Sequence, residues 1–183
     1  MMASEWSAGV VDSCWSATGS ELLVQSTEAI RCFTVGEALV ESGAMAIEPE
    51  NVFGIGHSAG DWWIVRREGH GVGVQRGLQG EVILLAELGD GEIKKAKLSP
   101  DGEMIACVLD GARVGLWSAV DGSRHFSLRF QDDDMAESLF APVMIEEFTW
   151  SRDSRLLSIR PGVPLDELMV VDVHERRIVG QIF

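Results

Sequence analysis

One stretch, residues 98–118 (LSPDGEMIACVLDGARVGLWS), constrains the fold more than any other part of the sequence. Its Ser99–Gly102 tetrapeptide is typical of a tight turn, because proline pre-sets φ and glycine accepts backbone angles that other residues avoid. An apolar run then leads to Asp110-Gly111, a strong two-residue hairpin signal, and to Val-Gly-Leu-Trp at 114–117. The pattern predicts three short strands, which cannot bury a face alone and need a partner to pack against.

The same pattern recurs along the chain at a nearly constant spacing. With the serine of the first turn as the marker, Ser16, Ser58, Ser99 and Ser151 are separated by 42, 41 and 52 residues. The longest interval contains a polar, acidic insertion at 131–142. A period of about 41–42 residues lies in the range of four-stranded propeller blades.

Each repeat is predicted to hold four strands, separated by Gly, Asp, Ser and Pro. The first strands are expected at 10–15, 52–57, 93–98 and 145–150, and the second at 22–25, 62–65, 104–108 and 156–159. The third are expected at 30–34, 72–75, 114–117 and 168–172, and the fourth at 38–41, 82–88, 124–128 and 178–182. No segment shows the apolar period of a capped helix. The sequence therefore predicts an all-β fold, a single domain over 1–183 with blade-like repeats at about 8–43, 50–90, 92–130 and 143–183.

The 98–118 stretch resembles the WD-repeat β-propellers, with an apolar residue, Ser-Pro-Asp-Gly, an apolar strand, Asp-Gly and an aliphatic-Trp pair. The fourth repeat resembles them moderately (FTWSRDSRLLSI, then ELMVVDV), the first less and the second least. Ser118 stands where the family has Asp after Trp117, and in the fourth repeat Asp172 is kept while Val171 replaces the Trp. The Gly-His pairs at 56–57 and 69–70 are not where the family places them, so its Asp–His–Ser–Trp network is not expected. The same turn also occurs in other propellers, including the TolB-like kind.

Four repeats fill the chain, whereas WD-type propellers usually have about seven or eight blades. A closed four-bladed ring, two chains completing one ring, and a part of a longer protein are the open alternatives, and an open arc is favoured over the small closed ring. An open arc exposes a sheet face at each end, which predicts association through the terminal blades, including a homodimer.

The resemblance implies a non-enzymatic protein–protein interaction scaffold, because propeller faces present loops rather than built-in chemistry. An accessory propeller of a larger enzyme complex is an alternative of the same fold. The sequence identifies no particular partner-binding residue.

A second function class comes from Gly56–Gly60 (GHSAG), which fits the nucleophile elbow of the α/β-hydrolases. A serine hydrolase would use Ser58, an acid such as Asp153 or Asp166, and His174. The elbow must lead into a helix, whereas the following DWWIVRREGHGVG is typical of a strand and a turn. The repeat register favours a turn at Ser58, and no catalytic residue is expected.

The net charge of −14 disfavours nucleic acid and anionic membranes as partners. The cysteines Cys14, Cys32 and Cys107 lie in apolar runs without a CxxC motif, which predicts free thiols in a reducing, cytoplasmic compartment. No signal peptide and no apolar run of about 18 residues is found.

No metal or cofactor is expected. The histidines at 57, 70, 125 and 174 are scattered, and the acidic run at 132–134 lacks the alternating oxygen ligands and glycine of a calcium loop.

The tryptophans and lysines of the predicted strands allow expectations about which side chains are buried and which are exposed. Trp62 and Trp63 are adjacent on a predicted strand, so one is expected in the core and one exposed as an interface anchor. The tryptophans at 15, 117 and 150 are expected in the core. The lysines at 94, 95 and 97 are expected as exposed charge, with a channel ligand or acidic peptide as the alternative.

Overall fold

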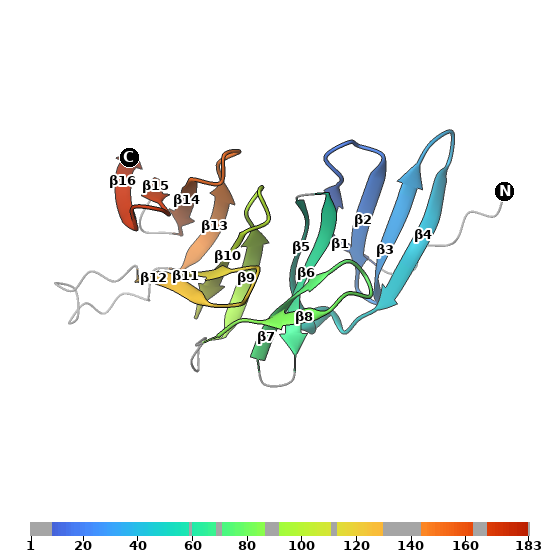
Figure 1. Ribbon diagram of the computed structural model, residues 1–183, viewed down its shortest axis with the longest axis horizontal. Helices are drawn as coiled ribbons and strands as arrows, with labels where there is room; N and C mark the ends of the chain where they lie inside the picture. Colours follow the sequence, from blue (N-terminus) through green and yellow to red (C-terminus); the bar gives the residue numbers. More distant parts are fainter. Residues whose placement is uncertain are drawn as a thin grey trace. The chain divides into compact units, whose positions relative to one another are not determined.

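The computed structural model describes residues 9–58, 60–68, 71–86, 92–110, 113–129, 144–162 and 168–182. In these residues the strands form four four-stranded antiparallel sheets, each with its strands in chain order (Figure 1). The fold class is therefore the predicted one, all-β with repeated four-stranded blades, as in a partial propeller.

The first sheet contains β1 (Val10–Trp15), β2 (Glu21–Ser26), β3 (Ala29–Val35) and β4 (Leu39–Ala46). After the short 3-10 helix η1 (Pro49–Asn51), the second sheet contains β5 (Val52–Ser58), β6 (Asp61–Glu68), β7 (Gly71–Arg76) and β8 (Val82–Leu84). The third contains β9 (Ile93–Leu98), β10 (Met104–Leu109), β11 (Arg113–Ser118) and β12 (Arg124–Arg129). The fourth contains β13 (Ile145–Trp150), β14 (Leu156–Pro161), β15 (Leu168–Asp172) and β16 (Arg177–Ile182).

All predicted strands overlap observed ones, and the largest differences concern fourth strands. The strand expected at 38–41 extends to Ala46 as β4, and the strand expected at 82–88 ends at Leu84 as β8. The inserted segment 131–142, which includes the acidic run at 132–134, lies outside the described residues.

The chain divides into two compact units, unit 1 (Met1–Leu84) with the first two sheets and unit 2 (Leu85–Phe183) with the other two. In unit 1 a buried cluster joins the two sheets: Leu23, Ile30, Cys32, Trp62 and Ile64. In unit 2 a larger one does so: Ala106, Val108, Val114, Leu116, Ile145, Phe148, Leu157, Ile159, Val171 and Val173. Within each unit, one blade therefore supplies the apolar face that the other needs in order to be stable.

A serine holds the first turn in the same way in three of the four repeats. Its side-chain oxygen accepts a hydrogen bond from the backbone N–H five residues later, and its carbonyl accepts one from the N–H of the fourth residue of the turn. The first contact is Glu21 N to Ser16 Oγ at 3.0 Å, Met104 N to Ser99 Oγ at 2.9 Å and Leu156 N to Ser151 Oγ at 2.8 Å. The fourth turn residue has positive φ each time, at Gly19, Gly102 and Ser154. The serine repeat in the sequence is thus a structural repeat.

Ser58 lies in a tight hairpin, not in a nucleophile elbow. It is the last residue of β5, Gly60 turns the chain at φ +82°, and β6 begins at Asp61. An elbow needs a helix after the serine, and here a strand follows. Of the other residues named for the triad, Asp153 and His174 belong to unit 2, and Asp166 lies outside the described residues.

Two tryptophan predictions are wrong. Trp62 and Trp63 are both buried, since Trp62 packs in the unit 1 core while Trp63 lies under the Arg76 guanidinium at 4.7 Å and donates to the Ser58 carbonyl. Trp15, expected in the core, is 54% exposed because β1 is covered on neither face along most of its length. Trp117 is fully buried as predicted, and Trp150 is partly buried.

The described residues contain free thiols at Cys14, Cys32 and Cys107. Among these residues, no three His, Cys, Asp or Glu side chains are grouped closely enough to hold a metal ion. No helix in the described part of the chain has the length and apolar character needed to span a membrane.

Candidate interaction site

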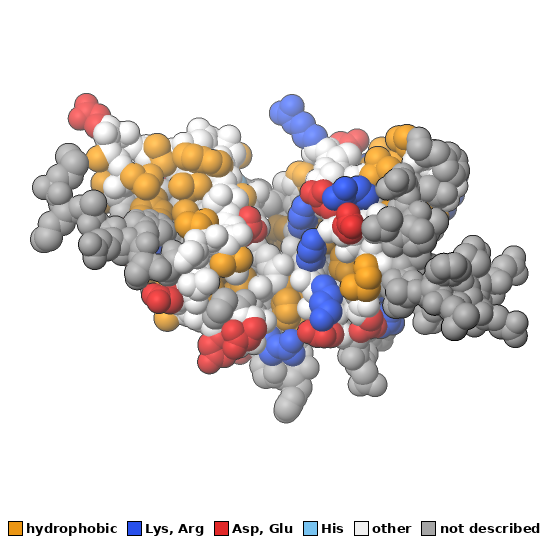
Figure 2. Space-filling model, turned by 180° about the vertical axis from the view of Figure 1, so that it is seen from behind, with side chains coloured by type: hydrophobic (Ala, Val, Ile, Leu, Met, Phe, Trp, Pro, Cys, Tyr) orange, Lys and Arg blue, Asp and Glu red, His pale blue; other side chains and the backbone are white. Residues whose placement is uncertain are grey.

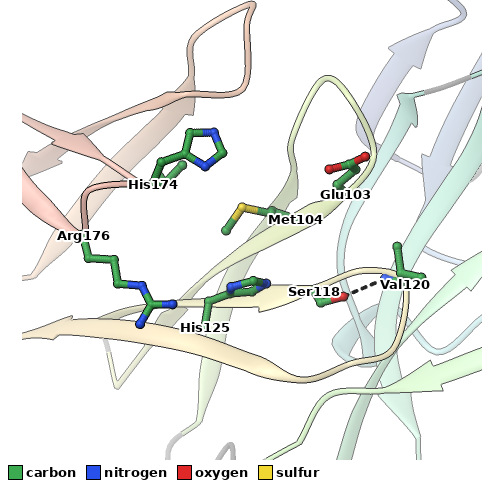
Figure 3. Close-up of a pocket in the computed structure, with 8 residues that line it drawn as sticks. Glu103, Met104, Ser118, Val120, His125, His174 and Arg176 are labelled. Atoms are coloured by element: carbon green, nitrogen blue, oxygen red, sulfur yellow. Dashed lines mark hydrogen bonds between the residues drawn. The ribbon is translucent and has the colours of Figure 1, made fainter.

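A pocket of about 380 Å³ lies in unit 2, where turns of the third and fourth sheets meet (Figure 3). Its lining comes from the start of β10, the β11–β12 turn, β12 and the β15–β16 turn. The lining residues are Glu103, Met104, Ser118, Val120, His125, Val173, His174 and Arg176.

The β11–β12 turn is held by the residue that ends the third strand. The Ser118 hydroxyl accepts hydrogen bonds from the N–H groups of Val120 (3.2 Å) and Asp121 (3.3 Å). The N–H and hydroxyl of Ser123 donate to Asp121 and, with Ser118, lower the pKa of that carboxyl to about 2. The fixed turn presents Val120 with 70% of its surface exposed.

The β15–β16 turn is held in the same way by Asp172, which also ends a third strand. Its Oδ1 accepts hydrogen bonds from the N–H groups of His174 (3.1 Å) and Glu175 (3.0 Å), and its Oδ2 accepts one from Arg155 Nε (2.8 Å). Ser118 therefore occupies the position of Asp172 and bonds the same two backbone N–H groups, two and three residues on. Each turn that borders the pocket is therefore held by the side chain of the strand residue that precedes it, Ser118 in one and Asp172 in the other.

The pocket has a nitrogen-rich side and an apolar floor. In Figure 3, His125, His174 and Arg176 surround one side of Met104, and Glu103 and Val120 lie on the other. Val173, which is 3% exposed, completes the floor. Arg176 has φ +56°, a conformation that side chains other than glycine rarely adopt.

No family model and no curated protein matches this sequence. Solved structures do match the fold. Hsv2 of Kluyveromyces lactis aligns with a TM-score of 0.67 at 19% identity, over 91% of this chain and 49% of that one. A chain from a crystal structure of the Mitotic Checkpoint Complex aligns with a TM-score of 0.71 at 17% identity, over 97% of this chain and 52% of that one.

The chain has a WD40-type propeller fold. The resemblance of 98–118 to the WD-repeat propellers is therefore confirmed at the level of the fold. The chain spans about half the length of the two propeller chains that it matches.

The sequence did not single out this pocket. The sequence marks the ends of the third strands, since Asp172 and Ser118 stand at the position where the WD-repeat propellers have an aspartate. It presents His125 and His174 only as scattered histidines, since nothing local indicates that β12 and the β15–β16 turn line one pocket. Their proximity depends on how the third and fourth sheets pack.

The β9 lysines are exposed, and each contacts a neighbour in unit 2. Lys94 pairs with Glu92 at 2.7 Å, Lys95 donates to the Glu146 carbonyl at 2.5 Å, and Lys97 lies over the Phe148 ring at 5.5 Å. The ammonium groups of the three lysines therefore already have contacts within the third and fourth sheets or the residues next to them. We therefore place the candidate site at the pocket, not on β9.

Asp172→Asn is expected to destabilise the WD40-type fold at neutral pH and much less in acid. The N–H of Glu175 and the Arg155 guanidinium lower the pKa of Asp172 in the folded state. A lowered pKa makes its contribution complete above the ordinary aspartate pKa of about 3.9, and the contribution is lost as the pH falls through the lower folded value. Urea unfolding at about pH 7, 4 and 2.5 should show the gap between wild type and variant closing. The exposed Asp12→Asn serves as control, and a gap independent of pH would contradict the prediction.

Proposed function

We propose that this protein is a non-enzymatic protein-interaction scaffold of the WD-repeat-like kind. The observation that carries the proposal is the unit 2 pocket, built from turns of two neighbouring blades and bordered by the exposed Val120. Turns of this kind can hold a partner, and the fold by itself fixes no reaction, so the proposal rests on the site. One of the similar chains belongs to a structure named as a complex, which supports protein partners in general.

Photo-crosslinking in cells tests this proposal. The crosslinking amino acid p-benzoylphenylalanine is placed at position 120, and, as the control, at Glu147, which is exposed on β13. One protein that crosslinks recurrently at 120 and not at 147 is the expected result. Identical crosslinks at both positions, or none at 120, would contradict a partner at the pocket.

The non-enzymatic part of the proposal is tested with a fluorophosphonate probe, which labels activated serines. No labelling is expected, because Ser58 lies in a hairpin and is 4% exposed. Stoichiometric labelling that Ser58→Ala abolishes would establish a serine hydrolase instead. The same experiment on a purified complex tests whether the chain supports an enzyme on another protein.

We propose that the edge strands β1 and β4 of the first sheet and β16 of the fourth sheet contact another copy of this chain. Large apolar side chains are exposed there, and Figure 2 shows apolar side chains gathered on the surface of unit 1. They are Val10, Val11 and Trp15 of β1, Leu39 and Val40 of β4, and Ile178, Val179 and Ile182 of β16. The similar solved chains are about twice as long as this chain. Two copies of this chain together would therefore have about as many residues as one of those chains. Exposed apolar strands of this kind favour association.

Light scattering on the purified chain is expected to give a dimer, and Ile178→Asp to give a monomer. Val120→Asp, an exposed change outside β1, β4 and β16, serves as control and should leave the dimer intact. A monodisperse wild-type monomer, or a dimer that persists in Ile178→Asp, would contradict pairing through this surface.

A reducing, cytoplasmic location is part of the same proposal. The free thiols of Cys14, Cys32 and Cys107 and the charge of −14 support it, and the charge also argues against nucleic acid and anionic membranes as partners. Fractionation of cells that express the chain tests the location.

A further inference from the structure

We propose that the unit 2 pocket binds an anionic side chain of a partner peptide, a carboxylate or a phosphate, beside an aliphatic residue. This inference rests on the proposed function, because it names the chemistry by which the scaffold recognises its partner. Three features of the pocket carry it: its unengaged nitrogen groups, the rigidity of the turn that bears Arg176, and its apolar floor.

Nitrogen-bearing side chains gather at this pocket although the chain carries a net charge of −14. Arg176, His125 and His174 line one side, whereas Glu103 is the only carboxylate of the lining. Within the described ranges of the chain, no hydrogen bond or ion pair engages the side chains of these three residues. A guanidinium flanked by two imidazoles suits a carboxylate or a phosphate, since charge-assisted hydrogen bonds to such groups are stronger than neutral ones.

Arg176 differs from the neighbouring arginines in that the acids near it pair with those arginines instead. Arg155 pairs with Asp172 at 2.8 Å, and Arg177 pairs with Glu175 at 2.6 Å. Both acids lie in or next to the turn that carries Arg176, yet neither of them pairs with its guanidinium. Asp172 also fixes this turn through the N–H groups of His174 and Glu175. The Arg176 guanidinium is therefore carried by a turn whose backbone is held by hydrogen bonds, which reduces the conformational entropy lost on binding.

The remainder of the pocket suits an aliphatic side chain. Met104 lies partly buried between the histidines and Val120, and Val173, which also lines the pocket, is buried. Val120, at 70% exposure, has apolar surface that a ligand would cover. Methionine adapts to side chains of different shape, so the floor can accept valine, leucine or isoleucine.

The test is a titration of the full chain, labelled with 13C at histidine, with capped tripeptides followed by NMR. The probes are Ac-Val-Glu-Val-NH2, its neutral analogue Ac-Val-Gln-Val-NH2, and Ac-Val-pSer-Val-NH2. The Glu peptide is expected to shift the His125 and His174 signals and to bind about threefold or more tighter than the Gln peptide, as for an exposed ion pair. The pSer peptide identifies the source of the anion: tighter binding than the Glu peptide indicates phosphate, and equal or weaker binding indicates carboxylate.

Arg176→Ala is expected to abolish the preference for the charged peptides. Arg152→Ala, on an exposed turn of the same unit, is the matched control and should keep it. Equal binding of the Glu, Gln and pSer peptides, or a preference that survives in Arg176→Ala, would overturn the inference.

The outcome is separable from that of the proposed function. A specific crosslink from position 120 together with peptides that bind without regard to charge would keep the scaffold and remove the anion site. An Arg176-dependent preference without any crosslinked protein would keep the anion site and remove the scaffold.

Discussion

Trp117→Ala is expected to lower the free energy of unfolding by about 3–5 kcal/mol. The indole is fully buried, and its Nε1 donates a hydrogen bond to the Ala86 carbonyl at 2.6 Å. Alanine would leave a cavity of nearly the whole ring and would remove the donor from a carbonyl that Trp117 now satisfies. Urea unfolding followed by circular dichroism measures the loss.

Trp15→Ala is the matched control for this experiment. Trp15 is 54% exposed at the end of β1, so its removal is expected to cost less than about 1 kcal/mol. A loss below about 1 kcal/mol for Trp117→Ala as well would mean that the ring is not part of the core of the blade.

The elements that the sequence predicts correctly are those that local physics decides. A turn such as Ser99–Gly102 needs only a serine oxygen, a proline and a residue that tolerates positive φ, and all are within four positions. The strands between such turns follow from apolar and β-branched runs. For this reason the strands could be located from the sequence, with most of their ends within one residue of the observed ones.

The failures concern positions whose environment is set by distant parts of the chain. Trp62 and Trp63 point to opposite faces of β6, and the sequence gives no sign that the second face is covered as well. A large apolar residue such as Trp15 is typical of a core position, but its side chain would be buried only if another sheet packed against it, and it is 54% exposed. Burial on each face is decided by sheet packing, which local patterns do not contain.

The pocket illustrates the same limit for function. In the sequence, Ser118 stands where the WD-repeat propellers have an aspartate, which suggests that the aspartate's contacts are lost. Its hydroxyl nevertheless accepts hydrogen bonds from the N–H groups two and three residues on, as the carboxylate of Asp172 does. The sequence therefore locates both turns. It does not show that His125 of β12 and Arg176 of the β15–β16 turn line one pocket.

Gly115→Ala is expected to destabilise the chain by about 1–3 kcal/mol, because the Trp117 ring lies directly over this glycine. A Cβ at position 115 would overlap Cη2 and would lie 2.5 Å from Cζ3 of the indole. The ring is fully buried and anchored through Nε1, so it has no room to withdraw. Gly56→Ala in β5, where nothing lies within 4 Å of the added Cβ, is the control and is expected to change stability by less than about 1 kcal/mol.

A double-mutant cycle shows whether the indole is the cause. In the Trp117→Ala background the overlap is gone, and Gly115→Ala should cost nothing or stabilise the strand by about 0.5–1 kcal/mol, since glycine is the more flexible residue in the unfolded chain. The two substitutions should therefore be coupled by at least about 1 kcal/mol, measured by urea unfolding of the four proteins. Additive effects would mean that the small residue at 115 serves another purpose. Coupling would explain why an aliphatic-Trp pair in this blade is preceded by a glycine: the strand has to leave space for its own tryptophan.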